Sequence, residues 1–142
     1  MSTLGETGPN RRLMQLSESE CWDLVGTQEV GRIGFVAEGS PQIFPVNFMV
    51  HERRILFRTT PYGAVAQAVT DTPIAFEVDA IDAANQTGWS VLLTGTGQHE
   101  TDPKVLHDLW GPDRATPWAD GSRVLWISLT PTAVSGRRIA WS

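Results

Sequence analysis

Short tracts in which apolar and polar residues alternate run through most of this chain, and turn-forming residues separate them. Such alternation is typical of β-strands that bury one face. In the tract 30–37, Ile33 and Phe35 fall on one face and Arg32 on the other. Because strands this regularly spaced hide their edges by closing, we predict a mainly β antiparallel barrel with small helices. Six tracts are clear, 30–37, 42–50, 55–60, 73–79, 88–99 and 124–129, and 134–139 is a candidate for another.

Three short helices are predicted between the strands. Ser17 and Glu20 have the spacing of a capping box, in which each side chain accepts a hydrogen bond from a free backbone N–H at a helix start. Asp102 followed by Pro103 suits another helix start, because Asp is a good N-cap and Pro is tolerated in the first turn. The expected helices are 18–26, 64–69 and 103–110, and a loop is expected at 111–121.

The length of 142 residues fits a single domain with a core of its own. Residues 1–15 carry many small and polar residues and are expected to form a flexible N-terminal tail, so the domain is placed at 16–142. No apolar run is as long as a signal-peptide core or a membrane-spanning helix. We therefore expect a cytoplasmic protein that makes no membrane contact.

The charge and the scarce residue types exclude several functions. A net charge of −5 argues against nucleic-acid binding, which needs concentrated Lys and Arg. Cys21 is the only cysteine, which excludes an intramolecular disulfide and a multi-thiolate zinc site and fits a reducing cytoplasm. Lys104 is the only lysine, which weakens a Schiff-base mechanism. His51, His99 and His107 lack zinc-site spacing and are expected to be structural or at the surface, so no metal site is predicted.

Five segments carry a family resemblance: 30–36 (VGRIGFV), 44–48 (FPVNF), 57–63 (FRTTPYG), 88–91 (GWSV) and 135–138 (SGRR). In this order and with similar separations, they resemble the FMN-binding split-barrel proteins of the pyridoxamine 5'-phosphate oxidase-like family. Each segment alone is weak, but five in register are fairly specific. The resemblance implies a six-stranded antiparallel split β-barrel and a homodimer with two cofactor sites at the subunit interface. FMN is the usual ligand, and some members of the wider superfamily bind a deazaflavin coenzyme instead.

Within this resemblance, Arg58 is the expected phosphate-binding residue. A guanidinium at a strand end can hold a phosphate through two parallel hydrogen bonds. Thr59, Thr60 and Gly63 are expected to complete the cradle with hydroxyls and loop amides. The helix that begins near Ala64 would direct its first N–H groups at the same anion.

Two observations weigh against that role. Arg58 can instead form a purely structural ion pair with Glu77 or Asp79, with Gly63 serving only the turn. Many relatives also place a Lys or Arg in the turn after this strand, where this chain has Ala-Val-Ala at 64–66. One phosphate partner is therefore missing, which implies weaker FMN binding, binding chiefly by Arg58 and amides, or a different cofactor.

In the family arrangement, Pro45, Val46 and Asn47 would lie along the isoalloxazine ring of the flavin. Their backbone groups would meet its polar pyrimidine edge while apolar neighbours enclose the ring. Trp89 and Ser90 would approach the cofactor from the partner subunit. Structural roles are the alternative for two of these residues, since Asn47 can bond to a nearby backbone bulge and Trp89 can fill the core.

The leading hypothesis is a flavin-dependent oxidoreductase that acts on an unidentified small-molecule substrate. The cofactor would supply the hydride chemistry while the barrel positions and shields it, so no catalytic side chain is named. A second hypothesis is a protein that holds FMN, deazaflavin, haem or another planar ligand without turnover, and a third is a dimeric domain without a ligand. Arg137 and Arg138 are candidates for contacting a substrate anion or the cofactor tail, and a solvated pair is the alternative.

Overall fold

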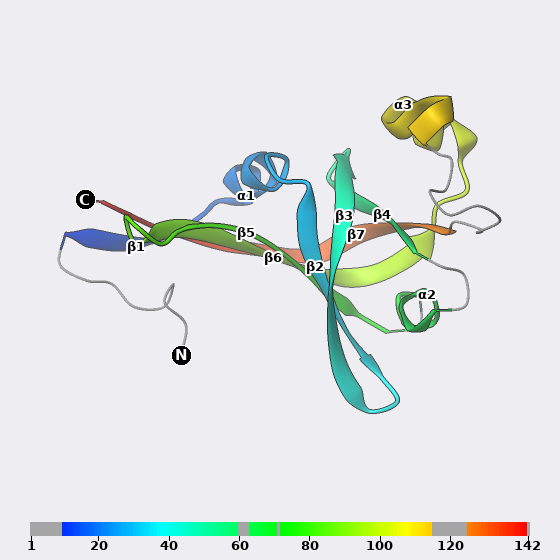
Figure 1. The fold of residues 1–142 in the computed structure, drawn as a ribbon, viewed down its shortest axis with the longest axis horizontal. Coiled ribbons are helices and arrows are strands. Elements are labelled where there is room, and N and C mark those ends of the chain that lie inside the picture. Colours follow the sequence, from blue (N-terminus) through cyan, green and yellow to red (C-terminus); the bar gives the residue numbers. More distant parts are fainter. Residues whose placement is uncertain (1–9, 60–62, 71, 115–124, 142) are drawn as a thin grey trace.

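The computed structural model describes residues 10–59, 63–70, 72–114 and 125–141. Within these ranges the chain forms seven strands and three short helices (Figure 1). In chain order they are β1 (Arg11–Gln15), α1 (Glu18–Val25), β2 (Val30–Ala37), β3 (Ser40–His51), β4 (Arg54–Thr59), α2 (Ala64–Ala68), β5 (Ile74–Asp82), β6 (Thr87–His99), α3 (Pro103–Arg114) and β7 (Leu125–Trp141).

Six of the strands close into a ring. Strand β7 pairs with β4, and the order continues through β3, β2, β5 and β6, which returns to β7. Every pairing in the ring is antiparallel. The predicted mainly β, six-stranded antiparallel barrel is therefore confirmed, and a seventh strand, β1, is added beside the later part of β7.

Strand β7 joins two parts of the molecule. The sequence predicted separate strands at 124–129 and 134–139, but β7 is one strand of 17 residues, because β6 pairs with it from Ile127 to Ile139 and so spans the gap between the two predicted strands. Its first residues, 125–129, pair with β4 and β6 and close the barrel. After a register shift opposite Thr94 and Gly95, its later residues pair with β6 and β1. Parts of β5, β6, β7 and β1 thus continue past the barrel as a four-stranded sheet, which we call the extension (78–82, 87–92, 135–141 and 11–15).

Strand β1 lies within the segment that was expected to be a flexible tail. Residues 11–15 pair with 137–141 at the other end of the chain, so the local composition gave no sign of the strand. The helix predicted to end near residue 110 continues to Arg114. The remaining part of the expected tail, residues 1–9, and residues 115–121 of the expected loop lie outside the described residues.

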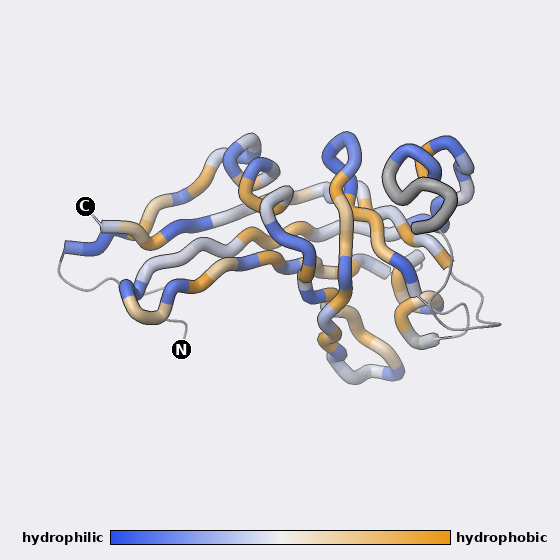
Figure 2. Tube along the Cα trace, turned by 45° about the horizontal axis from the view of Figure 1, so that its top comes forward, coloured by the Kyte–Doolittle hydropathy of each residue, from blue (hydrophilic) through white to orange (hydrophobic). Residues whose placement is uncertain are grey.

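Alternating side chains build the core, and the alternation of hydrophobic and hydrophilic residues along the long strands is visible in Figure 2. Inside the barrel, the ring of Phe76 contacts those of Phe48 and Phe57, at centroid distances of 5.2 and 6.0 Å. These three rings are buried and come from β5, β3 and β4, so they hold opposite walls of the barrel together.

Helix α1 covers one face of the extension. Cys21 on α1 lies so close to Gly136 on β7 that a Cβ on this glycine would be 2.7 Å from the thiol sulfur. Trp22 and Trp89 belong to the same buried cluster. We call the opposite side of the extension, which faces away from α1, the outer face; Ile81 and Leu92 on this side are 54% and 44% exposed.

The capping box at the start of α1 is formed as predicted. The Ser17 hydroxyl oxygen accepts a hydrogen bond from the Glu20 N–H at 3.1 Å, and a Glu20 carboxylate oxygen accepts one from the Ser17 N–H at 2.9 Å. We expect Ser17→Ala to lower the free energy of unfolding by about 1 kcal/mol, because the N–H of Glu20 loses its partner. Urea unfolding would measure this loss. Ser19→Ala, an exposed position inside the same helix, is the control and should not lower stability; equal losses in the two variants would contradict the cap.

Candidate functional site

Strands β3 and β4 separate part-way along their length. Their ladder ends at the pair Phe48 and Phe57, and β3 residues 40–47 pair with β2 on their other side. The β2–β3 hairpin therefore projects away from the barrel, as Figure 1 shows below its centre. This parting leaves one edge of β3 open next to the end of β4, and we call this region the split.

The open edge of β3 carries backbone groups that can bind a ligand. The N–H of Phe48 donates to the carbonyl oxygen of Glu29 at 3.0 Å, so the backbone of Phe48 faces β2. Because backbone direction alternates along an antiparallel strand, the N–H and C=O of Asn47 face the split, as does the C=O of Pro45, which has no N–H. The split thus presents one donor between two acceptors, with Pro45 exposed and Val46 half-buried beside them.

Arg58 lies at the split on β4. It follows buried Phe57, so its half-buried side chain points out of the barrel, and its guanidinium carbon is 5.8 Å from the ring centre of Trp126 on β7. The structural alternative, an ion pair of Arg58 with Glu77 or Asp79, is wrong. Both carboxylates bind the guanidinium of Arg32 instead.

The segment after Arg58 leads from the split into α2. Thr59 is half-buried at the end of β4, and Gly63 is the N-cap of α2 with extended backbone angles. Thr60 and the side chain of Ala64 lie outside the described residues. Residues 64–68 contain no basic side chain, so the only basic residue between 55 and 69 is Arg58.

Two predicted site residues lie elsewhere within the single chain. Trp89 and Ser90 are on the extension. Trp126, which lies beside Arg58 at the split, is at the other end of β7, and β6 reaches that end only near His99. At roughly 3.3 Å per strand residue, this separation is about 30 Å. Trp89 is only 7% exposed and belongs to the core, which is the structural role considered for it, whereas Ser90 is half-buried on the outer face.

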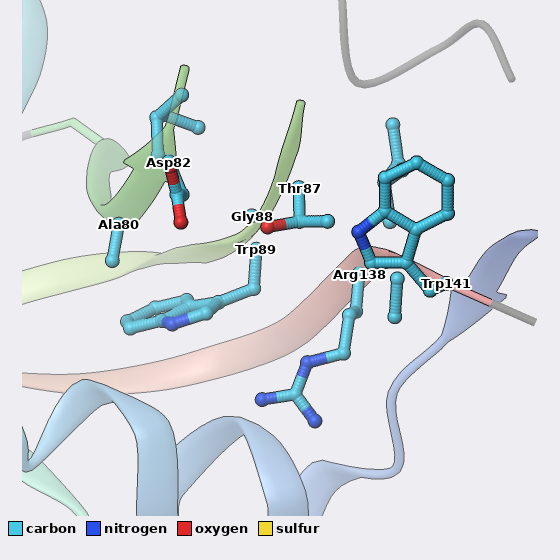
Figure 3. A pocket seen from close by; sticks show the side chains of 10 residues that line it. Ala80, Asp82, Thr87, Gly88, Trp89, Arg138 and Trp141 are labelled. Atoms are coloured by element: carbon cyan, nitrogen blue, oxygen red, sulfur yellow. The ribbon is translucent and has the colours of Figure 1, made fainter. Parts of the chain in front are cut away.

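Arg137 and Arg138 point to opposite faces of the extension. Arg138 lines a cavity of about 460 Å³ at the end of the extension, together with Trp89 and Trp141. Figure 3 shows Arg138 directed toward the helix and Trp141 on the other side of β7. Hydrogen bonds from Ser17 and, more weakly, the charge of Arg138 lower the pKa of Glu20, which places Arg138 near the start of α1.

Arg137 lines a different hollow. This hollow lies on the outer face, has a volume of about 520 Å³, and includes Ser90, Leu92 and Glu77 among its lining residues. The two neighbouring arginines therefore cannot act together on one ligand within a single chain, a separation that follows from the alternation of side chains along β7.

A charged cluster on the outer face was not predicted. One guanidinium nitrogen of Arg32 donates to Glu77 at 3.0 Å and to Asp79 at 2.7 Å. Burial, together with a hydrogen bond to Asp79, raises the pKa of Glu77 to about 7. The alternation in β2 and β5 indicated which side chains share a face, but only the register, in which Arg32 lies opposite Glu77, brings them together.

The raised pKa of Glu77 has a consequence for stability. The folded protein binds the proton of the Glu77 carboxyl group more tightly than the unfolded chain does. The stabilisation of the fold by this proton is therefore complete below about pH 4.5 and is lost as the pH rises through about 7. We expect Glu77→Gln to raise the free energy of unfolding at pH 8 by about 1 kcal/mol and to flatten its fall between pH 5 and 8. A larger effect is not expected, because the side chain is 35% exposed and solvent screens it. Urea unfolding across this pH range would measure the effect, with Glu38→Gln in an exposed turn as the control; a slope unchanged by Glu77→Gln would contradict the assignment.

Other kinds of site find little support in the described part of the chain. Its residues contain no group of three or more His, Cys, Asp or Glu side chains that could hold a metal ion. Burial raises the pKa of the Cys21 thiol, which makes it a poor nucleophile. None of the helices formed by the described residues is long and apolar enough to cross a membrane.

Residues 17–138 match the sequence profile of the family described as pyridoxamine 5'-phosphate oxidase. This range contains the split, all five resemblance segments and the extension except for β1 and residues 139–141 of β7. The chain belongs to the pyridoxamine 5'-phosphate oxidase-like family. The resemblance seen in the sequence is therefore confirmed.

Proteins similar to this member of the pyridoxamine 5'-phosphate oxidase-like family come from several bacteria. An FAD-binding protein of Mycobacterium smegmatis is 30% identical with a TM-score of 0.70, over 89% of this chain and 98% of that one. An uncharacterized protein of Mycobacterium tuberculosis is 29% identical over 141 residues, which cover 91% of this chain and 87% of the relative. An FAD-binding protein of Mesorhizobium loti shares the fold, with a TM-score of 0.68 at 18% identity over 89% of this chain and 97% of that one.

Proposed function

We propose that this chain is a flavin-binding oxidoreductase whose cofactor lies in the split between β3 and β4. The observation that carries the proposal is the open edge of β3 at Asn47 beside the guanidinium of Arg58. A flavin has a polar pyrimidine edge at one end and a phosphate at the other. The backbone groups of the open β3 edge suit the pyrimidine edge, and the guanidinium of Arg58 suits the phosphate.

Different residues of the split bind the phosphate and the ring of the cofactor. Arg58 holds a phosphate through its fork of N–H donors, and Thr59 adds a hydroxyl, with Thr60, Gly63 and Ala64 following along the chain. The backbone of Pro45 and Asn47 meets the pyrimidine edge while Val46 supplies apolar contact. When bound, the flavin supplies hydride or electron transfer, so the protein's part is to position the ring and exclude water.

The charge of the split does not by itself select one flavin. The terminal phosphate of FMN carries between 1.5 and 2 negative charges at about neutral pH, whereas each phosphate of the FAD pyrophosphate carries one. Arg58, the single basic residue of the β4–α2 segment, therefore meets about two negative charges in either flavin, on one phosphate in FMN and spread over two in FAD. Similarity to an FAD-binding protein of M. smegmatis supports FAD as the flavin.

A second copy of the chain is expected to complete the site. Ser90 lies about 30 Å from the split of its own chain, so a contact between Ser90 and the cofactor requires a second subunit. Ile81, Leu92 and Trp141, all on the outer face, leave 54%, 44% and 54% of their area exposed, and exposed apolar side chains gathered on one face mark interaction surfaces. These observations support the homodimer, and a single buried cysteine fits the reducing cytoplasm.

Titration of the ligand-free protein with FAD, FMN and the deazaflavin coenzyme in separate experiments tests the proposal. We expect saturable binding of one flavin per chain, seen as a shifted absorption band and altered flavin fluorescence, with FAD bound at least as tightly as FMN. Absence of binding by all three would sink the proposed site.

A turnover assay separates an enzyme from a protein that only holds the cofactor. The flavin-loaded protein is mixed with NADH or NADPH and with a quinone or a nitro compound as electron acceptor. Reproducible oxidation of the reductant above the rate of free flavin supports an oxidoreductase. Tight flavin binding without turnover of any acceptor contradicts it and supports a storage or carrier role, which the missing basic residue at 64–66 also favours.

A further inference from the structure

We propose that the hollow of about 520 Å³ on the outer face binds a small organic monoanion through Arg137, and that such a monoanion is the substrate class of this protein. Binding of the anion needs one chain only. Its role as the substrate rests on the proposed function, because it requires a flavin in the split and a second subunit beside that flavin.

Three neighbouring strands and β1 build this hollow. Ser90 on β6 and Ser135 on β7 have the smallest of the side chains that line it, so they form its floor. Leu92 and Leu13 stand beside the floor and are 44% and 42% exposed, which makes them apolar walls. A volume of about 520 Å³ lies within the range of about 300–1,000 Å³ that is usual for small-molecule sites, and apolar walls with a few polar groups are the usual lining.

The side chain of Arg137 belongs to the same face as these residues. Gly136, its neighbour on β7, contacts Cys21 of α1, and Val91, the neighbour of Ser90 on β6, is buried. Since side chains alternate along a strand, Arg137, Ser135 and Ser90 all face away from α1. The hollow therefore brings together two hydroxyls and one guanidinium.

Arg137 has no partner of its own within the part of the chain that the structure describes. Its side chain takes part in none of the ion pairs formed there. The two carboxylates of β5 on this face, Glu77 and Asp79, both bind the guanidinium of Arg32 instead. A guanidinium offers a fork of N–H donors that matches a carboxylate, so Arg137 is available to bind an anion from solution.

The opposite side of the hollow limits the charge of that anion. Glu77 lies opposite Leu92, and Leu92 opposite Ser135, so the Cα atoms of Glu77 and Arg137 are about 12 Å apart across two strands. Glu77 and Asp79 share one guanidinium, which leaves no positive charge at that side for a second anionic group. The hollow thus suits one negative group at Arg137, attached to an uncharged body that lies along the leucines.

Ser90 connects the hollow to the flavin. In the proposed homodimer Ser90 approaches the flavin in the split of the partner subunit, and Arg137 lies directly opposite Ser90 on β7, about 5 Å away between Cα atoms. An anion bound by Arg137 is therefore held beside that flavin, where a substrate has to be. Arg138, the other candidate for this role, points toward α1 on the far side of the sheet (Figure 3).

Binding of simple carboxylates to the flavin-free protein tests the site. Benzoate and hexanoate are titrated into the full chain by calorimetry, and their neutral isosteres benzamide and hexanamide are titrated in parallel. We expect each carboxylate to bind at least about tenfold more tightly than its amide, because only the carboxylate forms a charge-assisted pair with the guanidinium. Arg137→Gln should abolish this preference. Arg138→Gln, which removes the neighbouring arginine on the opposite face, is the matched control and should retain it.

A second variant separates a formed site from simple attraction to a surface charge. Ser135→Leu keeps the guanidinium but fills the floor of the hollow, so it should weaken binding of both carboxylates at least about tenfold. Ser135 and Arg137 are both exposed, so neither variant should unfold, which circular dichroism can verify.

The outcomes judge the site and its role separately. Failure of both carboxylates to bind, an unchanged preference in Arg137→Gln, or full binding by Ser135→Leu would overturn the site. Addition of benzoate to the flavin-loaded protein is expected to shift the flavin absorption band, and binding without a shift would overturn the substrate role. If carboxylates bind but the flavin titration fails, the proposed function and the substrate role fall while the anion site stands.

Discussion

Replacing Arg58 by Ala is expected to weaken flavin binding by about 10- to 100-fold. A hydrogen bond to a charged group contributes about 1.5–3 kcal/mol, and each 1.4 kcal/mol corresponds to about tenfold in affinity. The guanidinium at the end of β4 is the only basic group between 55 and 69, so no neighbour on this segment can replace it. Fluorescence titration with FAD and FMN measures the change, and the loss should be greater for FMN if its phosphate relies on this residue alone.

Two further variants separate binding from folding. Arg58→Lys keeps the charge but loses the two-pronged geometry, so its affinity should lie between those of the wild type and Arg58→Ala. Arg12→Ala removes an exposed arginine on β1 and should bind flavin normally. The contact of Arg58 with Trp126, at 5.8 Å, contributes only about 0.5–1 kcal/mol, so all three variants should unfold at similar urea concentrations. Wild-type flavin affinity in Arg58→Ala would remove this residue from the site.

The barrel was predictable from the sequence because its strands bury one face. Alternation gave β2 and β5, a nearly continuous β-forming run gave β6, and the spacing of Ser17 and Glu20 gave the start of α1. These signals are local, since they depend on residues two to four positions apart. The same local signals placed Asn47 and Arg58 on adjacent strands, and the register brings both to the split.

The features that were missed depend on contacts between distant residues. β1 forms only because β7 offers an edge at the other end of the chain, and β7 remains one strand across Pro131 because β6 follows it through a register shift. The pairing of Arg32 with Glu77 and Asp79 likewise requires the register of β2 on β5. Composition and periodicity contain no information on register, so the sequence left open an ion pair of Arg58 with the same two carboxylates.

Replacing Phe76 by Ala is expected to lower the free energy of unfolding by about 3–5 kcal/mol. The ring is fully buried and contacts both Phe48 and Phe57, so its removal leaves a cavity at the centre of the barrel. Such a loss is a large part of the total stability of a domain of this size, about 5–15 kcal/mol. Urea unfolding at low temperature measures it, and Phe76→Leu, which fills part of the cavity, should lose less.

The same ring explains why β2 has a glycine at position 31. A Cβ on Gly31 would lie 2.4 Å from one ring carbon of Phe76, so Gly31→Ala should cost about 1–3 kcal/mol in the wild type. In the Phe76→Ala protein the methyl group enters the cavity, and its cost should fall by at least about 1 kcal/mol, a coupling that a double-mutant cycle measures. Gly34→Ala is the control on the same strand, because its Cβ would be no closer than 3.7 Å to a neighbour and should cost the same in both backgrounds. If the Gly31 and Phe76 losses simply add, the glycine is set by the carbonyl oxygen of Glu77, 3.1 Å from the same Cβ, and not by the ring.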